Sequence, residues 1–373
     1  MGSPVARLAE LGQSPWYDNL TRPLARGGLA RLVSEHGIRG VTSNPTIFEK
    51  AIAAGGDYDE QLREELARHG DVRRAYWALV ERDIADAADV LRPWYEEWGH
   101  ADGYVSVEVD PGLAHDPDGT VAQARDLFGR LARPNLMIKI PATAAGIPAI
   151  TRAIAEGINV NVTLIFSLDR YRAVIEAYLA GLEARAARGE PLADVASVAS
   201  FFVSRVDTET DRRLPEGHPL RGRAAVANAK LAYQVFLGAF AGPRWEALAA
   251  AGARLQRPLW ASTSTKNPAY PPTLYVDELI GPNTVNTLAD ASLDALVAGH
   301  GTLRPGTVTE DVEGARAVVA GLAAAGVDLD DVTATLEREG VAAFSASYRA
   351  ALATLEERGR AVTGAGRARP AGG

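Results

Sequence analysis

The sequence predicts a (β/α)8 (TIM) barrel with extra N- and C-terminal helices, forming one domain over residues 1–363, and two observations support this fold class. Eight short segments rich in β-branched and apolar residues recur along the chain, and helical periodicity fills most intervals between them. Strands that alternate with helices form parallel sheets, and eight such units close into a barrel of about 250 residues. The chain has 373 residues, so we assign the surplus to added helices.

A doubly wound open sheet is the alternative arrangement for alternating strands and helices. Such a sheet often carries a Gly-x-Gly-x-x-Gly turn after an early strand, and no early strand here is followed by one. A Walker-type phosphate loop is also absent from the sequence. Both absences favour the barrel.

Proline and glycine residues mark several ends of the predicted strands and helices. Pro45 closes the second strand because proline has no amide hydrogen for the sheet. Gly37 and Gly157 stop the helices before the second and fifth strands. The eight strands are predicted over Ser14–Asn19, Ile38–Pro45, Tyr104–Pro111, Asn135–Ala142, Ile158–Phe166, Ser197–Ser204, Pro258–Thr263 and Thr284–Leu288.

Apolar residues at helical spacing predict the elements between the strands. A long helical region from Thr46 to Trp98 is interrupted near Gly55 and Gly70, because glycine weakens a helix interior. Residues 364–373 are small and polar and are predicted to form a disordered tail. The other helices are predicted over about Val5–Leu11, Leu24–Gly37, Thr120–Leu131, Ala145–Glu156, Leu168–Arg188, Gly222–Ala241, Arg244–Ala251, Ala291–Ala298, Glu310–Ala325 and Asp330–Gly359.

Composition excludes several classes of function. The net charge of −8 argues against nucleic acid or an anionic membrane as the main partner. The chain has no cysteine, so no disulfide or thiolate site is possible, and its six histidines lack metal-ligand spacing. No signal-peptide pattern and no apolar run of about 20 residues is present, so we expect a cytoplasmic protein.

Lys139 is the residue around which the site is predicted. It lies inside an apolar strand, and the chain has only four lysines against 35 arginines. Desolvation favours the uncharged amine, which is a nucleophile. The alternative is a strand-end lysine that reaches water or pairs with a carboxylate. The strand alone does not distinguish the two.

Polar residues near the C-terminal ends of the strands bear on that choice, because barrel enzymes place their chemistry there. Side chains at corresponding heights on several strands would converge on one pocket. Asn161 and Thr163 lie two residues apart, so both face the barrel interior if the apolar residues between them pack on helices. The polar residues at these positions are Asp18, Asn44, Glu108, Lys139, Asn161, Thr163, Ser200, Arg205 and Ser262.

Structural roles remain open for several of these residues. Asp18 could cap the following helix, and Asn44 before Pro45 is a common turn dipeptide. Glu108 could serve only to neutralise Lys139. Arg205 could form a surface ion pair with Asp207.

The combination of residue types points to Schiff-base chemistry on a phosphorylated sugar. A lysine amine adds to a ketone, and the iminium accepts electrons from a breaking C–C bond, while carboxylates move the protons. Arg205, Ser262 and Lys266 could hold the phosphate. A serine triad is unsupported because no serine occupies a Gly-x-Ser-x-Gly turn.

Several motifs resemble the transaldolase family, in its longer bacterial subgroup. The segment 41–46 (Val-Thr-Ser-Asn-Pro-Thr) resembles the N-terminal signature, and 136–143 (Leu-Met-Ile-Lys-Ile-Pro-Ala-Thr) resembles the segment around the Schiff-base lysine. Residues 107–110, 157–164 and 200–205 are further matches, and the resemblance covers roughly residues 14–300.

The resemblance implies roles for four catalytic residues. Lys139 would form the Schiff base with the C2 carbonyl of sedoheptulose 7-phosphate or fructose 6-phosphate. Asp18 would take the C4 hydroxyl proton, and Glu108 would exchange protons through a water also held by Thr163. The enzyme would transfer a dihydroxyacetone unit from sedoheptulose 7-phosphate to glyceraldehyde 3-phosphate, giving erythrose 4-phosphate and fructose 6-phosphate in the pentose phosphate pathway.

The resemblance also implies binding roles and partners. Asn44 and Asn161 would hydrogen-bond the dihydroxyacetone unit, and Ser200 and Phe202 would line the pocket. No metal or organic cofactor would be needed. The partners would be small sugar phosphates, with neither nucleic acid nor membrane, and the protein would be a monomer or homodimer.

Two departures and two rival functions follow from the resemblance. Lys266 stands where shorter family members carry arginine, and the strand-eight Asn286 is a weaker candidate still. One rival is a fructose 6-phosphate aldolase, whose known members carry glutamine where Glu108 stands. The other is a non-catalytic barrel that only binds sugar phosphates.

Overall fold

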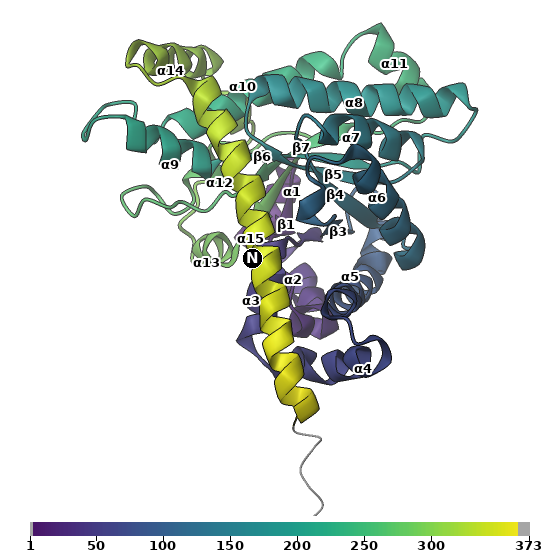
Figure 1. Cartoon of the computed structure of the whole chain (residues 1–373). Coiled ribbons are helices and arrows are strands. Elements are labelled where there is room, and N and C mark those ends of the chain that lie inside the picture. Colours follow the sequence, from purple (N-terminus) through teal and green to yellow (C-terminus); the bar gives the residue numbers. More distant parts are fainter. Residues whose placement is uncertain (1–2, 365–373) are drawn as a thin grey trace, which may run out of the picture.

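The chain forms a closed eight-stranded parallel barrel, seen in a computed structural model that describes residues 3–364 (Figure 1). The strands follow one another around the barrel in chain order, and β8 pairs with β1. The (β/α)8 prediction is confirmed, because closure leaves none of the edge strands that an open sheet would have. The strands are β1 (Gln13–Tyr17), β2 (Gly40–Thr42), β3 (Tyr104–Glu108), β4 (Leu136–Pro141), β5 (Val160–Ile165), β6 (Ser197–Phe202), β7 (Gln256–Ala261) and β8 (Thr284–Leu288).

The helices cover the outside of the barrel (Figure 1). Several of them start at a residue whose side chain caps the helix, and in some of these a proline follows directly. Asn44 accepts from the Ile47 amide at the start of α3, and Asp116 and Ser167 cap α6 and α8 in the same way. The helices are α1 (Pro4–Glu10), α2 (Leu29–His36), α3 (Pro45–Ala54), α4 (Asp59–His69), α5 (Val72–Glu97), α6 (Pro117–Leu131), α7 (Gly146–Ala155), α8 (Leu168–Ala187), α9 (Ser204–Arg213), α10 (Ala224–Ala239), α11 (Pro243–Ala250), α12 (Leu274–Asp277), α13 (Asp290–Val297), α14 (Val312–Ala324) and α15 (Leu329–Gly364).

The sequence did not predict α9 and α12. The α9 segment is dominated by polar residues, so apolar periodicity gives no signal there. Tertiary contacts support it instead, since the buried Asp207 accepts hydrogen bonds from Tyr275 Oη and the Ala225 amide, each at 2.8 Å. The α12 helix has four residues, too few for a periodic pattern.

The strand register sets which side chains lie abreast inside the barrel. Glu108 on β3 pairs with Lys139 on β4, which pairs with Asn161 on β5. Paired residues on neighbouring parallel strands point to the same face of the sheet. The three polar side chains therefore form one row across three adjacent strands.

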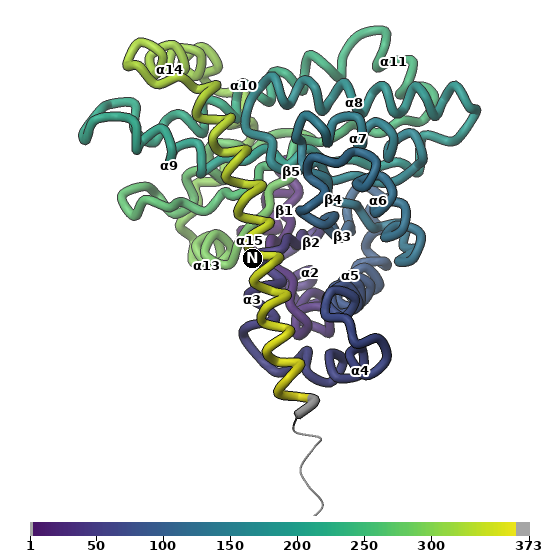
Figure 2. The backbone as a smooth tube through the Cα atoms, viewed as in Figure 1, coloured from purple at the N-terminus to yellow at the C-terminus, as the bar shows by residue number. Residues whose placement is uncertain are grey.

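The 36-residue helix α15 runs across the barrel, as both backbone views show (Figures 1 and 2). It packs against α3, α4, α5 and α9, which lie far from it in sequence. Its Phe344 is buried. The C-terminal helix thereby covers the region where the strands end.

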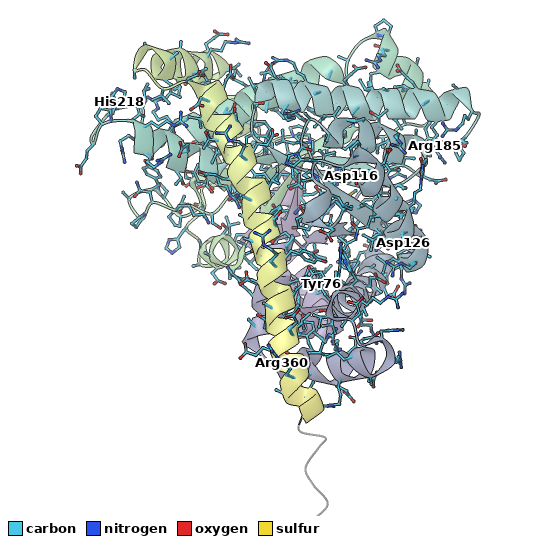
Figure 3. The ribbon with its side chains drawn as sticks, viewed as in Figure 1. Tyr76, Asp116, Asp126, Arg185, His218 and Arg360 are labelled. Atoms are coloured by element: carbon cyan, nitrogen blue, oxygen red, sulfur yellow. The ribbon has the colours of Figure 1, made fainter. Side chains whose placement is uncertain are left out.

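Charged side chains are spread over the outer helices, such as Asp126 on α6 and Arg185 on α8 (Figure 3). Many arginines there pair with carboxylates, as Arg244 does with Glu176 and Glu183. Within residues 3–364, no single helix is long and apolar enough to cross a membrane. The bent pair of α10 and α11 passes on length and composition alone.

The predicted disordered tail, 364–373, lies outside the described residues except for Gly364, which ends α15.

Candidate active site

A pocket of about 280 Å³ opens at the C-terminal ends of the strands. Strand ends and the loops after them supply most of its wall, and α3, α9 and α15 supply the rest. This is the end of the barrel at which the sequence placed the site. Eight predicted residues line it: Asp18, Asn44, Lys139, Ser200, Phe202, Arg205, Ser262 and Lys266.

Lys139 is buried deep in this pocket. It is 5% exposed, and its Nζ donates to the Ser43 carbonyl oxygen at 3.2 Å. Nζ also lies 3.8 Å from Glu108 Oε2, beyond the usual length of a direct hydrogen bond. The alternative of a lysine that reaches water is therefore wrong, and the carboxylate contact is loose.

Glu108 is buried beside the lysine, and Oε2 has no hydrogen-bond partner in the described protein. Burial raises the pKa of its carboxyl to about 7, with Asp18 adding to the rise and Lys139 opposing it. A carboxyl group with a pKa near 7 holds both protonation states at neutral pH. It is therefore suited to giving and taking protons.

Asp18 and Asn44 reach the pocket from the first two strands. The Asp18 carboxylate accepts from Thr42 Oγ1 at 2.7 Å, and it caps no helix, so the capping alternative for Asp18 is wrong. Asn44 does cap α3, with Oδ1 accepting from the Ile47 amide at 3.0 Å. The cap fixes the side-chain amide of Asn44 at the pocket wall, so the turn role and the site position coexist.

Asn161, Thr163 and Glu108 do not line the open pocket, so the expected convergence of all strand-end residues on one surface is wrong for these three. All three are buried, and in the strand register Glu108 and Asn161 flank Lys139, so both adjoin the lysine without reaching the open pocket. Asn161 donates to Ser106 Oγ at 3.0 Å and accepts from Ser200 Oγ at 2.7 Å. Thr163 Oγ1 is buried without a partner among the described residues.

Arg205 lies on α9, with its guanidinium carbon 5.2 Å from the centre of the Phe202 ring. Burial lowers its pKa, while the charges of Asp18 and Glu339 oppose that shift. The alternative of a surface pair with Asp207 is wrong, because Asp207 is buried and bonded to Tyr275 and Ala225.

Lys266 and Ser262 complete the wall that Arg205 begins. Partial burial lowers the pKa of Lys266, and the positive charges of Arg205 and Lys50 lower it further. Ser262 Oγ lies 3.1 Å from Ser204 Oγ. These residues bring hydroxyl and cationic donors to one side of the pocket.

Asn286 does not belong to the pocket. It donates to Gln13 and accepts from Thr263, whereas its neighbour Thr287 lines the pocket, as alternation along a strand requires.

Sequence reasoning missed Thr42, Lys50 and Phe344, which also line the pocket. A signal for Lys50 was available, because the chain has only four lysines. The structure places three of them on this one pocket. Phe344 gave none, since only the path of α15 brings it there.

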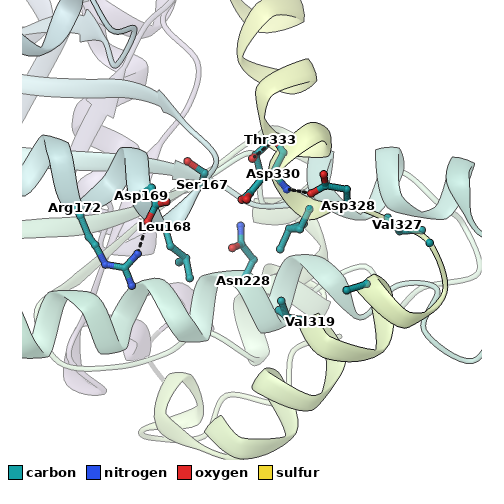
Figure 4. Close-up of a pocket in the computed structure, with 13 residues that line it drawn as sticks. Ser167, Leu168, Asp169, Arg172, Asn228, Val319, Val327, Asp328, Asp330 and Thr333 are labelled. Carbon is teal, nitrogen blue, oxygen red and sulfur yellow. Dashed lines mark hydrogen bonds and ion pairs between the residues drawn. The ribbon is translucent and has the colours of Figure 1, made fainter.

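A larger cavity of about 480 Å³ lies between α8, α10, α14 and α15 (Figure 4). Asn228 projects into it, with Nδ2 donating to the Phe166 carbonyl at 2.8 Å, and Asp169 pairs with Arg172. Its wall contains neither a lysine nor any predicted site residue. Size alone therefore does not identify the candidate site.

The fold and the pocket define a class: a (β/α)8 enzyme scaffold with a buried strand lysine beside a carboxyl group. Residues 15–355 match the family model described as Transaldolase/Fructose-6-phosphate aldolase. The chain belongs to this family.

Curated relatives resemble the chain over nearly its whole length. A protein named Transaldolase from Parafrankia sp. (strain EAN1pec) is 53% identical over 363 residues, covering 96% of this chain and 98% of the relative. Transaldolase from Saccharopolyspora erythraea is 55% identical, covering 95% and 97%. Transaldolase from Thermobifida fusca is 54% identical, covering 93% and 96%.

Proposed function

We propose that this chain is a transaldolase of the pentose phosphate pathway, moving dihydroxyacetone from sedoheptulose 7-phosphate to glyceraldehyde 3-phosphate. The products are erythrose 4-phosphate and fructose 6-phosphate. The observation that carries the proposal is Lys139, a buried amine beside Glu108 in the barrel of a transaldolase-family chain. The reaction proceeds on protein side chains, in the cytoplasm.

The first step forms the covalent link. Nζ of Lys139 adds to the C2 carbonyl of the donor sugar, giving a carbinolamine. Its hydroxyl leaves as water once Glu108 has supplied a proton, and the iminium remains on the lysine. The unpartnered oxygens of Glu108 and Thr163 support a shared water as the proton carrier.

The second step breaks the C3–C4 bond. Asp18, held by Thr42, accepts the C4 hydroxyl proton while the bonding electrons flow into the iminium. An aldose phosphate leaves and a three-carbon enamine stays on Lys139. The enamine then attacks the aldehyde carbon of the acceptor, and the same steps run in reverse.

The remaining pocket residues hold the sugar. Arg205, Ser262 and Lys266 bind the phosphate by charge-assisted hydrogen bonds. Phe202 supports the Arg205 guanidinium.

The dihydroxyacetone unit would be held by the amides of Asn44 and Asn161. The cap fixes Asn44, and Ser106 and Ser200 fix Asn161. Ser200 also lines the pocket wall.

Fructose 6-phosphate aldolase activity is the second candidate, because the family description includes it. The names of the relatives and the presence of Glu108 favour transfer. Initial rates of fructose 6-phosphate consumption, with and without erythrose 4-phosphate, separate the two. Transaldolase activity requires the acceptor, and equal turnover in both conditions would contradict the proposal.

Borohydride trapping tests the lysine assignment. With fructose 6-phosphate present, peptide mass spectrometry is expected to find a reduced three-carbon adduct on Lys139. Lys230, which pairs with Glu278 outside the pocket, is the internal control and should stay unmodified. An adduct that persists in Lys139→Ala refutes the nucleophile, and no adduct at all favours the non-catalytic barrel.

A further inference from the structure

The pocket carries a basic cluster, Arg205, Lys266 and Lys50, on three different segments. Arginines on the outer helices commonly pair with carboxylates, as Arg82 does with Asp86. Within residues 3–364, none of the three cluster cations forms an ion pair with a carboxylate. Asp18 and Glu339 act on these cations only through longer-range attraction. Like charges gathered without a directly paired carboxylate are unfavourable unless an anion is bound among them.

Helical geometry places Lys50 in this cluster. Lys50 follows Thr46 by four residues and Ile47 by three, so it shares a face of α3 with both, and all three line the pocket. Phe48 and Ile52 lie on the opposite side and are buried in the core. One face of α3 thus packs in the core, and the opposite face brings Lys50 to the pocket.

The C-terminal helix α15 holds α3 in place. Ser347 Oγ lies 2.9 Å from Thr46 Oγ1, and Arg358 Nη1 donates to the Ile52 carbonyl at 2.6 Å. The Asn44 cap fixes the other end of α3. Lys50 therefore has a flexible side chain on a firmly held helix.

We infer that Lys50 is a third binding group for the phosphate of the substrate, acting with Arg205 and Lys266. This inference rests on the proposed function. A sugar phosphate carries a charge of about −1.5 to −2 at neutral pH. A lysine supplies a point charge and cannot grip two phosphate oxygens in a plane as arginine does, so Lys266 alone leaves room for another donor.

The role of Lys50 is recognition of charge. In a chain of net charge −8, a positive pocket steers anionic substrates to the site. Lys50 is an exposed residue at the pocket rim and lies on no strand of the barrel. Its loss should therefore weaken capture of phosphorylated sugars and leave the bond-breaking step intact.

The test compares Lys50→Gln with Lys50→Arg and the control Arg63→Gln. Arg63 is an exposed cation on α4, outside the pocket, so its variant removes the same charge elsewhere. Lys50→Gln should raise KM for erythrose 4-phosphate by about 3- to 10-fold, with kcat nearly unchanged. KM for unphosphorylated D-glyceraldehyde as acceptor should stay constant, and inorganic phosphate should inhibit Lys50→Gln less.

Lys50→Arg should retain the low KM, and Arg63→Gln should match the parent protein in every assay. Equal KM values for Lys50→Gln and Arg63→Gln would overturn the inference. So would a rise in KM that is the same for the phosphorylated and unphosphorylated acceptors. If the parent protein itself has no transfer activity, the proposed function fails. Orthophosphate binding, measured by calorimetry, then tests Lys50 separately. Weaker binding in Lys50→Gln supports the phosphate-binding role of Lys50, and unchanged binding refutes it.

Discussion

Both ends of the barrel carry buried polar residues, but the two ends differ in how fully these residues are hydrogen-bonded. At the floor, where the strands begin, Asp102 accepts from Ser14 Oγ at 2.7 Å and Trp16 Nε1 at 2.9 Å. Arg257 donates to the same carboxylate at 2.9 Å, and Arg39 lies 3.6 Å away. The floor carboxylate is saturated by its neighbours.

At the mouth, where the strands end, the polar residues are left incomplete. Glu108 Oε2 and Thr163 Oγ1 have no partner among the described residues, and Lys139 touches Glu108 only at 3.8 Å. Buried oxygens near the strand starts also lack partners, on Asn135 and Gln256, but these belong to uncharged amides. Buried polar groups normally have hydrogen-bond partners. A carboxyl oxygen without one, beside an amine, therefore indicates a site where a substrate binds.

Asp102→Ala tests the structural side of this comparison and should have the largest effect on stability. Removing the carboxylate leaves the Trp16 indole without its acceptor and Arg257 without its counter-charge, so the free energy of unfolding should fall by about 3 kcal/mol. Urea titration measures this, with Asp86→Ala, at a partly exposed position, as control. Activity per folded molecule should be unchanged, and its loss at unchanged stability would contradict the distinction between floor and mouth.

Glu108→Gln tests the chemical side through pH. The pKa of Glu108 in the folded protein is raised to about 7, above its unfolded value, so the native state holds a proton that the unfolded state releases. The parent protein should therefore lose stability as pH rises from about 4.5 to 7, by up to about 3 kcal/mol.

Glu108→Gln lacks this titration, so it should gain stability relative to the parent protein between pH 5 and pH 8. Its activity should fall by about 100-fold, because no group then supplies the proton. Urea unfolding at both pH values measures the first effect. Parallel pH dependence in the two proteins would show that Glu108 is ionised throughout this range.

Thr163→Val should give the smallest effect on stability. Its hydroxyl has no protein partner, so the free energy of unfolding should change by no more than about 0.5 kcal/mol. Activity should still fall by about 10-fold if the hydroxyl positions a water.

Thr284→Val is the matched control for Thr163→Val. Its hydroxyl donates to the Gly281 carbonyl at 2.7 Å and accepts from Gln13, so its removal should cost about 1 to 2 kcal/mol without affecting activity. Thermal unfolding and initial rates measure both variants. A Thr163 variant as unstable as the Thr284 variant would assign Thr163 a structural role.

Sequence alone determined the strand order and the position of Lys139. β-Branched runs, glycine stops and Pro45 are local signals, and strand alternation then predicts which residues face inward. That reasoning placed Asp18, Asn44, Lys139, Ser200, Arg205 and Ser262 on one pocket. The family resemblance added Phe202, and the expected phosphate chemistry added Lys266.

Only the tertiary structure decided the rest, because it depends on contacts between distant segments. Asp207 is buried and bonded to Tyr275, and Phe344 reaches the pocket on α15. Lys50 reaches the pocket rim from a helix that α15 holds. Whether a polar side chain is satisfied, as Asp102 is and Glu108 is not, follows from the positions of its neighbours in space. Local periodicity carries no information about that, since burial and pairing are set by the packed barrel.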